Sequence, residues 1–596
     1  MYAIAGIISQ NYDVEIMDNM LKSICPAKDT SSDIYADGNC ILGSKLISKR
    51  FKEDILGFGD NMVVLSGKIY NYKQLKEELE DLGVTFVSDN DSELISKGYT
   101  AWGSALVQKL NGIFAFAVWD NNNKELFLAR DPFGVKTLYY SLCNNSFVFS
   151  SGLKAFLSFP DYHKELNEEI LSSYLCFNSV ATNETFFKGV YRLEPGHYLT
   201  FKDNQMKKEC YFRPLFHPEQ QDLAELTDKI NSAVENSVLE QTKGDNCGSF
   251  LSSGVDSSYI VSILKPENTY TVGYSDTKYD ETIYSTELAN ALGISNKVKL
   301  VSAKEYLDNF SAVMCSLDEP LANPSVPALY LGVIEAAKDV DVILSGEGAD
   351  ELFGGYLSYD DENAQSWYSK IPFAFRRIAY KIADILPESS GLNFVWRKGQ
   401  RLEEHHIGLG RVFRDKDAMA LLKNKNQIRT KDITAPYYEQ FKDCSALQKR
   451  QAIDYYFWLI NDFVFAVVKS AEALGIEARF PILCKELCDV AMHLTDDMKL
   501  NCNTTKYAFR LAAEKVIPTD AHKKKKLGFP VPLKEWIKDD LFYNDIKEKF
   551  KSSVAEKFFN KKKILRLLEL HKSGKKDCYK KIWAIYSFIV WYNNFF

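Results

Sequence analysis

Two corners rich in serine and glycine, each placed directly after a short apolar run, constrain the fold of this chain most. The first corner, residues 250–258, follows a strand predicted at residues 249–251. The second, residues 342–356, repeats the arrangement with an apolar run that ends in Ser345 and Gly346. In an open parallel sheet, ligands bind where the carboxyl ends of neighbouring strands meet. The two corners are therefore expected to open into one crevice.

Both corners have the chemistry of a site for phosphate and a metal ion. Serine and glycine let the backbone approach an anion closely, and the helix predicted to begin near Ser258 presents unpaired N–H groups at its start. Asp256 and Asp350 each lie inside such a corner. A carboxylate beside phosphate oxygens is unfavourable unless a divalent cation lies between them, so we interpret both as Mg²⁺ ligands. The first corner lacks the lysine of the G-x-x-x-x-G-K-[ST] pattern, which excludes an ordinary P-loop.

Each corner also has a simpler interpretation. The first could be a serine-rich turn that caps a helix, and the second could be an acidic, glycine-rich surface loop. Two such corners, each with an aspartate, are what a nucleoside triphosphate with a bridging metal requires. Their combination favours a site for a nucleoside triphosphate and Mg²⁺.

Length, charge and cysteine usage narrow the class of protein. A chain of 596 residues with 46% hydrophobic residues is expected to form two or more globular domains. Its formal net charge of -7 disfavours nucleic acid as a partner. The 12 cysteines are scattered without a C-x-x-C pair, which is typical of the reducing cytoplasm. The first eight residues predict a buried strand, and no membrane segment is expected.

The chain is expected to divide near residue 210. In residues 1–210, short apolar runs alternate with Asn, Asp and Gly clusters, which is typical of a β-rich domain. Helices are predicted at residues 72–82 and 92–103. In residues 211–596, strands alternate with helical patterns up to about residue 356, as in a parallel α/β sheet. From residue 361 onward the pattern is mainly helical. The apolar runs of the first part are residues 4–8, 62–65, 113–119, 126–129 and 147–149.

The second part carries a family resemblance. Residues 252–258 resemble the pyrophosphate loop of the N-type ATP pyrophosphatases, and residues 345–356 resemble the signature of the asparagine synthetases. The resemblance implies an α/β domain of the adenine-nucleotide alpha hydrolase type, with a helical C-terminal part. Further fragments match that family in order and spacing; they are residues 271–274, 280–281, 317–320, 324–327, 475–483, 506–510 and 524–532.

The resemblance also implies roles for individual residues. Glu347 would orient or deprotonate the incoming amine, and Lys526 would neutralise pyrophosphate and the developing charge. Glu347 could instead be structural, and Lys526 could be one of four solvated lysines at residues 523–526. The residues expected to bind ATP are Leu251, Ser252, Ser253, Gly254, Asp256, Ser257, Val272, Ser345 and Gly346, and those expected to bind Mg²⁺ are Asp256 and Asp350.

The first part resembles the class II glutamine amidotransferase domain of asparagine synthetases. The matching fragments are residues 69–71, 111–116 and 130–140, and they imply an Ntn-type αββα sandwich. In that family an N-terminal Cys supplies both the attacking thiol and the amine that serves as base. This chain begins Met1-Tyr2, and the internal Cys25 and Cys40 cannot supply both groups. We therefore predict that no glutaminase nucleophile is present.

Other positions of the implied glutamine site have changed as well. Ser66-Gly67-Lys68 stands where the family has Asn-Gly-Glu, so the oxyanion-hole amide is lost. Leu46 aligns with the glutamine-binding Arg, whereas Asp91 matches the residue that holds the glutamine α-amine. Gly67 and Asp91 are thus remnants of a site that we expect to be inactive.

Three functions are compatible with these patterns. The first is an asparagine synthetase-like ligase that converts aspartate, ATP and ammonia into asparagine, AMP and pyrophosphate. The second is an amide ligase that acts on another carboxylate, in natural-product or surface-polysaccharide modification; the changed positions Val468, Lys469 and Cys484 favour it. The third is a non-catalytic scaffold, against which the retained Asp256 and Asp350 argue. The expected partners are a small carboxylate and ammonia or another amine, and a homodimer is allowed.

Overall fold

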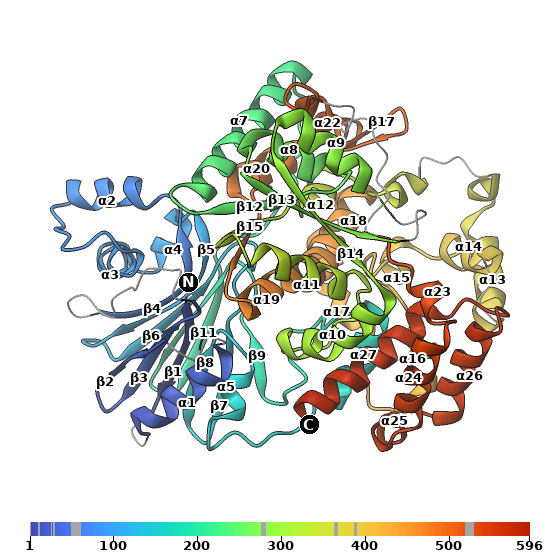
Figure 1. The fold of residues 1–596 in the computed structure, drawn as a ribbon, viewed down its shortest axis with the longest axis horizontal. Helices are drawn as coiled ribbons and strands as arrows, with labels where there is room; N and C mark the ends of the chain where they lie inside the picture. Colours follow the sequence, from blue (N-terminus) through green and yellow to red (C-terminus); the bar gives the residue numbers. More distant parts are fainter. Residues whose placement is uncertain are drawn as a thin grey trace.

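The computed structural model describes residues 2–9, 12–25, 27, 30–48, 61–275, 280, 282–362, 367–386, 390–518 and 530–596. In Figure 1 a β-rich part, coloured blue to teal, lies beside an α/β part in green and a helical part in yellow to red. The boundary expected near residue 210 stays a prediction. The last strand of the β-rich part ends at Cys210, and the next helix is α7 (Leu223–Thr242). Residues 211–222 connect the two.

The β-rich part consists of two antiparallel sheets packed face to face. One has the order β2-β3-β1-β8-β7-β9 and the other the order β11-β10-β6-β5-β4. The strands of the first sheet are β1 (Tyr2–Ile8), β2 (Ser32–Ala36), β3 (Cys40–Leu46), β7 (Tyr139–Cys143), β8 (Ser146–Ser150) and β9 (Val190–Arg192). Those of the second are β4 (Asn61–Ile69), β5 (Gly112–Asp120), β6 (Glu125–Arg130), β10 (His197–Lys202) and β11 (Gln205–Cys210).

The alternation of side chains along the strands explains the four layers. On β5, Ala115, Ala117 and Trp119 pack into the core between the sheets. Their neighbours Phe114 and Phe116 pack outward under α2 (Tyr72–Asp81) and α3 (Asp91–Trp102). A strand whose two faces are both covered is expected to be apolar along its length, as β5 is from Ile113 to Trp119. With α1 (Val14–Ile24) on the other sheet, the order of layers is αββα, which confirms the predicted fold.

The α/β part is built on a parallel sheet of five strands with the order β14-β13-β12-β15-β16. In Figure 1, α7, α8 and α9 lie above this sheet and α10, α11 and α19 lie below it, so the fold is doubly wound. The strands are β12 (Cys247–Phe250), β13 (Asn268–Tyr274), β14 (Ser295–Val301), β15 (Val342–Leu344) and β16 (Glu477–Arg479). The helices are α8 (Val255–Leu264), α9 (Thr282–Leu292), α10 (Ala303–Ser316), α11 (Ser325–Ala336) and α19 (Phe465–Ala473).

One strand of this sheet departs from the sequence expectation. Residues from 361 onward were expected to be mainly helical, yet β16 returns to the sheet and pairs with β15. It is only three residues long and fully buried. A strand this short carries no readable periodicity, so only its tertiary neighbour reveals it.

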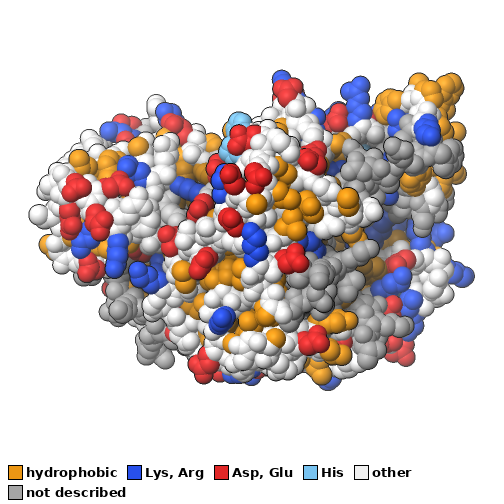
Figure 2. Space-filling model, turned by 90° about the horizontal axis from the view of Figure 1, so that it is seen from above, with side chains coloured by type: hydrophobic (Ala, Val, Ile, Leu, Met, Phe, Trp, Pro, Cys, Tyr) orange, Lys and Arg blue, Asp and Glu red, His pale blue; other side chains and the backbone are white. Residues whose placement is uncertain are grey.

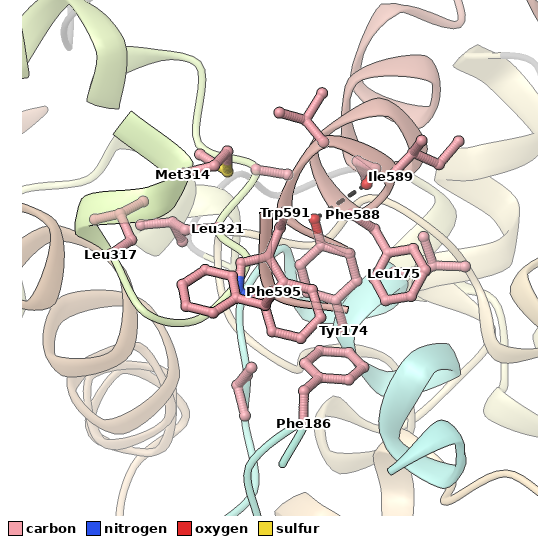
Figure 3. Close-up of a cluster of buried hydrophobic side chains, with 14 of the residues drawn as sticks. Tyr174, Leu175, Phe186, Met314, Leu317, Leu321, Phe588, Ile589, Trp591 and Phe595 are labelled. Carbon is pink, nitrogen blue, oxygen red and sulfur yellow. Dashed lines mark hydrogen bonds between the residues drawn. The ribbon is translucent and has the colours of Figure 1, made fainter. Parts of the chain in front are cut away.

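Apart from β16 and the short antiparallel pair β17 (Leu500–Asn501) and β18 (Thr504–Thr505), the described C-terminal part is helical. Its last helix anchors it to the β-rich part. On α27 (Tyr579–Phe595), Trp591 packs against Phe186, with 5.1 Å between the ring centroids. Tyr174 donates a hydrogen bond to the carbonyl oxygen of Ala584 at 3.0 Å (Figure 3). The other helices of eight or more residues are α13 (Phe373–Ile385), α14 (Ser390–Lys398), α17 (Thr430–Gln440), α18 (Ala446–Asp454), α20 (Lys485–His493), α22 (Tyr507–Glu514), α24 (Asp540–Lys551) and α26 (Lys561–Lys572), with a π-helix at Tyr455–Val464.

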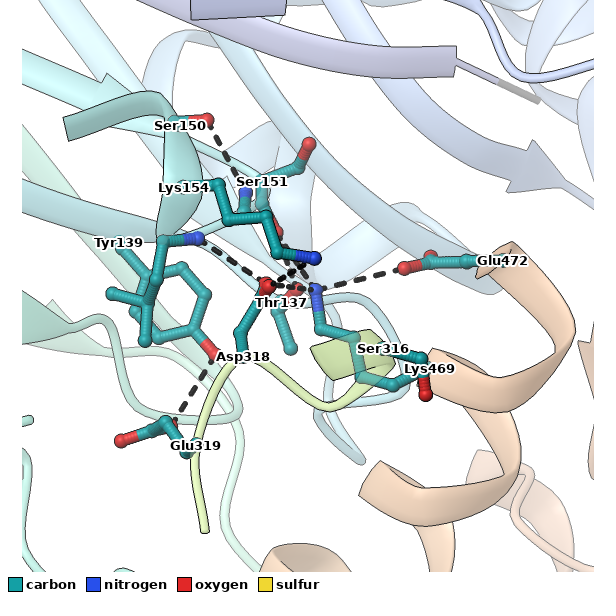
Figure 4. Close-up of polar contacts among 12 residues, drawn as sticks. Thr137, Tyr139, Ser150, Ser151, Lys154, Ser316, Asp318, Glu319, Lys469 and Glu472 are labelled. Carbon is teal, nitrogen blue, oxygen red and sulfur yellow. Dashed lines mark hydrogen bonds and ion pairs between the residues drawn. The ribbon is translucent and has the colours of Figure 1, made fainter. Parts of the chain in front are cut away.

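A buried polar cluster joins the β-rich and α/β parts (Figure 4). The carboxylate of Asp318 lies 3.3 Å from Nζ of Lys469 and 3.4 Å from Nζ of Lys154. Lys469 also donates to the carbonyl oxygen of Ser151 at 3.3 Å. Lys469 thus serves in the contact between the two parts.

On the face drawn in Figure 2, acidic and basic side chains are interspersed, and hydrophobic side chains gather at the right-hand end. None of the helices within the described residues is long and apolar enough to cross a membrane.

Candidate functional site

The two serine- and glycine-rich corners lie side by side at the point where the strand order of the parallel sheet reverses. Strand β12 is the first of the sheet in the chain, and it lies between β13 and β15. In the register of β12 and β15, Ser249 pairs with Leu344, so both strands end at the same level. The crevice outside the carboxyl ends of neighbouring strands, at the point where the strand order reverses, is the usual ligand site of such folds.

The first corner is shorter than the sequence suggests. Helix α8 begins at Val255 rather than near Ser258, with Gly254 as its N-cap. The carbonyl oxygen of Gly254 accepts a hydrogen bond from the backbone N–H of Ser258 at 3.2 Å and one from its hydroxyl at 2.8 Å. These bonds start the helix earlier and place Asp256 in its first turn.

Serine hydroxyls shape the turn itself. Oγ of Ser252 lies 2.9 Å from Oγ of Ser257 and accepts a hydrogen bond from the backbone N–H of Gly254 at 3.1 Å. Ser252 is exposed, Ser253 is half-buried, and Leu251 is held in the sheet by a hydrogen bond to Tyr270 at 2.9 Å. The turn is thereby held next to the start of α8, where backbone N–H groups can bind an anion.

The second corner touches the first at Gly346. A side-chain carbon added to Gly346 would lie 2.9 Å from the backbone nitrogen of Ser257 and 3.0 Å from the carbonyl carbon of Asp256. Only a glycine allows the two backbones to come this close. Ser345 is buried and donates from its backbone to the carbonyl oxygen of Arg479 at 2.9 Å. Asp350 then lies in the first turn of α12 (Ala349–Phe353), not in the loop as predicted.

Lys506 brings the two aspartates together. Its ammonium nitrogen lies 2.6 Å from both carboxylate oxygens of Asp256 and 2.8 Å from Oδ1 of Asp350. The side chain of Lys506 is 2% exposed. Burial lowers the pKa of Lys506, while the neighbouring Asp256 opposes this shift. The family resemblance includes residues 506–510 but predicts no role for Lys506; two acidic corners in need of a cation were the available signal.

The two carboxylates fit the Mg²⁺ ion that the family implies. Both lie within 2.8 Å of one nitrogen atom, so a single small cation can contact both. Mg²⁺ is commonly bound by one or two carboxylates together with substrate phosphates. Asp256 and Asp350 are the residues that would hold it.

Glu347 lies beside two buried carboxyl groups. Glu351 is 2% exposed and Asp462 is 0% exposed, whereas Glu347 is half-buried. Burial raises the pKa of Glu351 to about 8 and that of Asp462 to about 7, and the nearby charge of Glu347 adds to both shifts. Glu351 accepts a hydrogen bond from the hydroxyl of Tyr356 at 2.6 Å. Glu347 is therefore the least buried carboxyl group of this trio.

Val272 and Lys526 are the two remaining predicted site residues. Val272 lies on β13 next to β12, is half-buried and would contact a side chain placed at Gly332. That position suits a wall beside the nucleotide base. Lys526 lies outside the described residues.

In the glutamine site that the resemblance implies, Tyr2 and Leu46 lie where a nucleophile and a guanidinium are expected. Tyr2 on β1 pairs directly with Leu46 on β3, and both are buried. Cys25 donates its thiol hydrogen to the carbonyl oxygen of Leu46, and burial raises the pKa of the Cys25 thiol. Burial raises the pKa of Cys40 as well. Neither thiol is therefore poised as a nucleophile.

The remnant positions keep structural roles. Gly67 has φ of 131° and lies so close to the carbonyl oxygen of Ile113 that no other residue fits there. Asp91 accepts a hydrogen bond from the backbone N–H of Ile69 at 3.0 Å. Lys68 forms an ion pair with Asp245 at 2.5 Å, so the changed position now joins the two parts of the chain.

The chain matches two family models. The model described as asparagine synthase matches residues 229–593, and the model described as glutamine amidotransferase domain matches residues 1–212. The chain is 35% identical to asparagine synthetase (glutamine-hydrolyzing) 1 of Bacillus subtilis (strain 168), across 89% of this chain and 85% of that protein. It is 33% identical to a putative asparagine synthetase (glutamine-hydrolyzing) of Mycobacterium bovis, across 90% of this chain and 84% of that protein.

The match to solved structures is weaker. A complex of glutamine phosphoribosylpyrophosphate amidotransferase from B. subtilis with ADP and GMP is 15% identical with a TM-score of 0.27, and the match covers 50% of this chain and 65% of that one. This likeness carries no argument about function.

Proposed function

The chain belongs to the asparagine synthase family and is an ATP-dependent amide-forming ligase, and we propose that its substrates are aspartate and ammonia. The observation that carries this proposal is the meeting of the two corners at Gly346, with Asp256 and Asp350 converging on Lys506. Both elements that would hold the triphosphate are thus in contact, and Glu347 lies next to them in sequence. A scaffold without catalytic function would have no reason to keep this arrangement of charges.

The proposed chemistry has two steps. Amide formation from a carboxylate requires a better leaving group than oxide. An oxygen of the substrate carboxylate attacks the α-phosphorus of ATP, so that a C–O–P bond forms and pyrophosphate leaves. The nitrogen lone pair of ammonia then attacks the acyl carbon, AMP leaves, and the amine proton is taken up by a base.

The residues of this chain serve both steps. The backbone N–H groups at residues 252–257 bind phosphate oxygens at the start of α8. Asp256 and Asp350 hold Mg²⁺, which when bound neutralises negative charge on the phosphates. Lys506 fixes the positions of both carboxylates. Glu347 orients the incoming amine and accepts its proton, because it is the least buried carboxyl group of its trio. Each well-placed group of this kind is typically worth about 3 kcal/mol of barrier.

We also propose that the β-rich part no longer hydrolyses glutamine. Tyr2 and Leu46 form an apolar pair where the family resemblance places a nucleophile and a guanidinium. Lys68 is engaged by Asp245, and Asp91 is engaged by the backbone of Ile69. The curated relatives are called glutamine-hydrolyzing, so this chain would differ from them in its nitrogen source.

A single assay tests both proposals. Pyrophosphate release is measured with ATP and Mg²⁺ alone, with aspartate and ammonium, and with aspartate and glutamine. We expect turnover with ammonium and at least a hundredfold less with glutamine. Equal turnover with both donors would overturn the loss of glutaminase activity.

The same assay addresses the other carboxylate substrates. ATP-dependent pyrophosphate release that ignores aspartate but responds to a cell extract would replace aspartate by another carboxylate. Two of the positions that favour this alternative, Lys469 and Cys484, have structural contacts. Lys469 pairs with Asp318, and the buried Cys484 is the N-cap of α20, so both give the alternative little support.

A further inference from the structure

Helix α13 carries a row of large apolar side chains on its exposed face. Single exposed apolar residues are common on protein surfaces, whereas a contiguous patch marks a site of interaction. In Figure 2 hydrophobic side chains gather at the right-hand end, where Figure 1 places α13 and α14. Four residues of α13 recur at the spacing of one helical face, and each is at least 59% exposed. We call them the α13 stripe: Phe375, Ile378, Ile382 and Ile385.

The α13 stripe is not the face by which α13 packs in the protein. Ala383, on another side of the helix, is 1% exposed. The indole N–H of Trp396 on α14 donates to the carboxylate of Asp384 at 2.8 Å, and the ring of Trp396 lies 6.3 Å from that of Tyr380. Helix α14 therefore holds α13 from the side away from the stripe, and the described residues leave the stripe uncovered.

The charges on this pair of helices are mostly positive. Asp384 is the only acidic residue in α13 and α14, and its carboxylate lies 2.9 Å from Nζ of Lys416. Arg377 forms an ion pair with Glu404 at 2.6 Å, so its charge is matched locally. The other cationic residues of the two helices are Arg376, Lys381, Arg397 and Lys398.

Two lysines border the α13 stripe. Lys381 is the neighbour of Ile382 on the flank of the stripe, and Lys370 precedes the helix. Both lysine side chains are exposed, and neither forms an ion pair with another described residue. A lysine side chain can lie along an apolar surface with its stem and place its ammonium group in a polar layer.

An apolar helical face bordered by lysines fits the surface of an anionic lipid bilayer. A helix of this kind lies in the plane of the membrane surface, with its apolar side chains at the acyl chains and its cations at the headgroups. A second copy of this chain fits less well. In a symmetric contact the lysines of both copies would border the same interface, and the one carboxylate of the two helices is already paired with Lys416.

We propose that the protein docks reversibly on an anionic phospholipid membrane through the α13 stripe. The stripe supplies apolar contact with the acyl chains, and Lys370 and Lys381 supply the preference for anionic headgroups. Docking of this kind requires no membrane-spanning segment. It is also independent of the substrates proposed for the ligase reaction.

The first test compares vesicle binding of the full chain. Sedimentation is measured with vesicles of equal parts phosphatidylglycerol and phosphatidylcholine, and with vesicles of phosphatidylcholine alone, in about 0.1 M salt. We expect the wild type to bind the anionic vesicles at least tenfold more tightly than the neutral ones. Equal binding to both kinds of vesicle, or binding to neither, would overturn the proposal.

The second test removes the apolar contact. The variant I378Q/I382Q changes two side chains that are each 59% exposed, so the fold should be kept. Its matched control is L239Q/L541Q, which changes exposed leucines of α7 and α24. We expect at least tenfold weaker binding to anionic vesicles for I378Q/I382Q and no change for the control. Thermal unfolding and pyrophosphate release without vesicles should match the wild type in both, and an equal loss of binding in both would contradict a role of the stripe.

The third test removes the bordering charges. The variant K370Q/K381Q should bind anionic vesicles at least threefold more weakly and neutral vesicles as the wild type does. The control K202Q/K243Q removes two exposed lysines outside the helical part and should change neither affinity. An unchanged affinity of K370Q/K381Q for anionic vesicles would exclude anionic headgroups as the partner.

Sedimentation of the free protein distinguishes lipid from a second copy. We expect the wild type and I378Q/I382Q to have the same oligomeric state in the absence of vesicles. A wild-type dimer that becomes a monomer in I378Q/I382Q would show that the α13 stripe binds another copy of this chain, and the lipid proposal would be wrong.

Discussion

The ammonium nitrogen of Lys506 lies 2.6 Å from each carboxylate oxygen of Asp256. The two residues come from segments 250 positions apart in the chain. Asp350 adds a second carboxylate at 2.8 Å, so two negative groups share one buried positive group. Asp256 also interacts with the guanidinium of Arg510, so two cations lie near the two carboxylates in this structure.

Replacing Asp256 by Asn should lower the rate of ATP-dependent pyrophosphate release about 100-fold, because one carboxylate of the proposed metal site is lost. The measurement is pyrophosphate release under saturating substrates, with thermal unfolding as a check of the fold. Asp308→Asn is the matched control, since Asp308 is an exposed residue of α10 that pairs only locally with Lys304. Full activity of D256N would exclude Asp256 from the site.

Replacing Gly346 by Ala should raise the KM for ATP at least tenfold, because the new carbon would meet the backbone of Asp256 and Ser257 within about 3 Å. Gly391→Ala is the control, because Gly391 lies in α14, far along the chain from both corners, and a carbon added there meets nothing within 4 Å. Equal KM values for G346A and G391A would mean that the contact of the corners does not matter for ATP.

The pH dependence of stability should reveal the buried carboxyl group of Glu351. Burial raises its pKa from 4.5 to about 8, so between these values the folded state holds a proton that the unfolded state has lost. Its contribution to stability is complete below pH 4.5 and is lost as the pH rises towards 8, by at most about 1.4 kcal/mol per pH unit.

Replacing Glu351 by Gln should remove this slope, because the amide is neutral at all pH values and its oxygen still accepts from Tyr356. The measurement is the Tm of E351Q and of the wild type between pH 5 and pH 8. The difference in Tm, variant minus wild type, should grow with pH. A constant difference would mean that Glu351 is ionised throughout.

Replacing Lys469 by Met should lower the free energy of unfolding by about 3 kcal/mol, because Asp318 would lose a buried partner. Lys154→Met is the matched control. Lys154 also pairs with Asp318, but its side chain is 27% exposed and Lys469 is only 6% exposed, so we expect a loss of less than about 1 kcal/mol for K154M. Chemical denaturation measures both; a larger loss in K154M would contradict the assigned burial.

Residues that are close in the chain could be interpreted from the sequence alone. The predicted helices at residues 72–82 and 92–103 correspond to α2 and α3, and the five apolar runs of the first part all lie in strands. The αββα fold was implied by the family resemblance of residues 69–71, 111–116 and 130–140, and the parallel α/β sheet was indicated by the alternation of strands with helical patterns. Local composition also pointed to both corners as anion sites.

Only the tertiary structure decided which groups meet. The sequence determined that Asp256 and Asp350 lie in similar corners, but not that Lys506 lies between them or that Gly346 touches Ser257. The sequence also predicts that Lys469 differs from the residue that the family resemblance implies at this position. It does not predict that Lys469 pairs with Asp318 between the two parts of the chain. Short-range sequence patterns report backbone preference and burial, whereas contacts between distant segments depend on how whole layers pack. For that reason the chemistry of each corner could be predicted from the chain, and the cation that joins the corners could not.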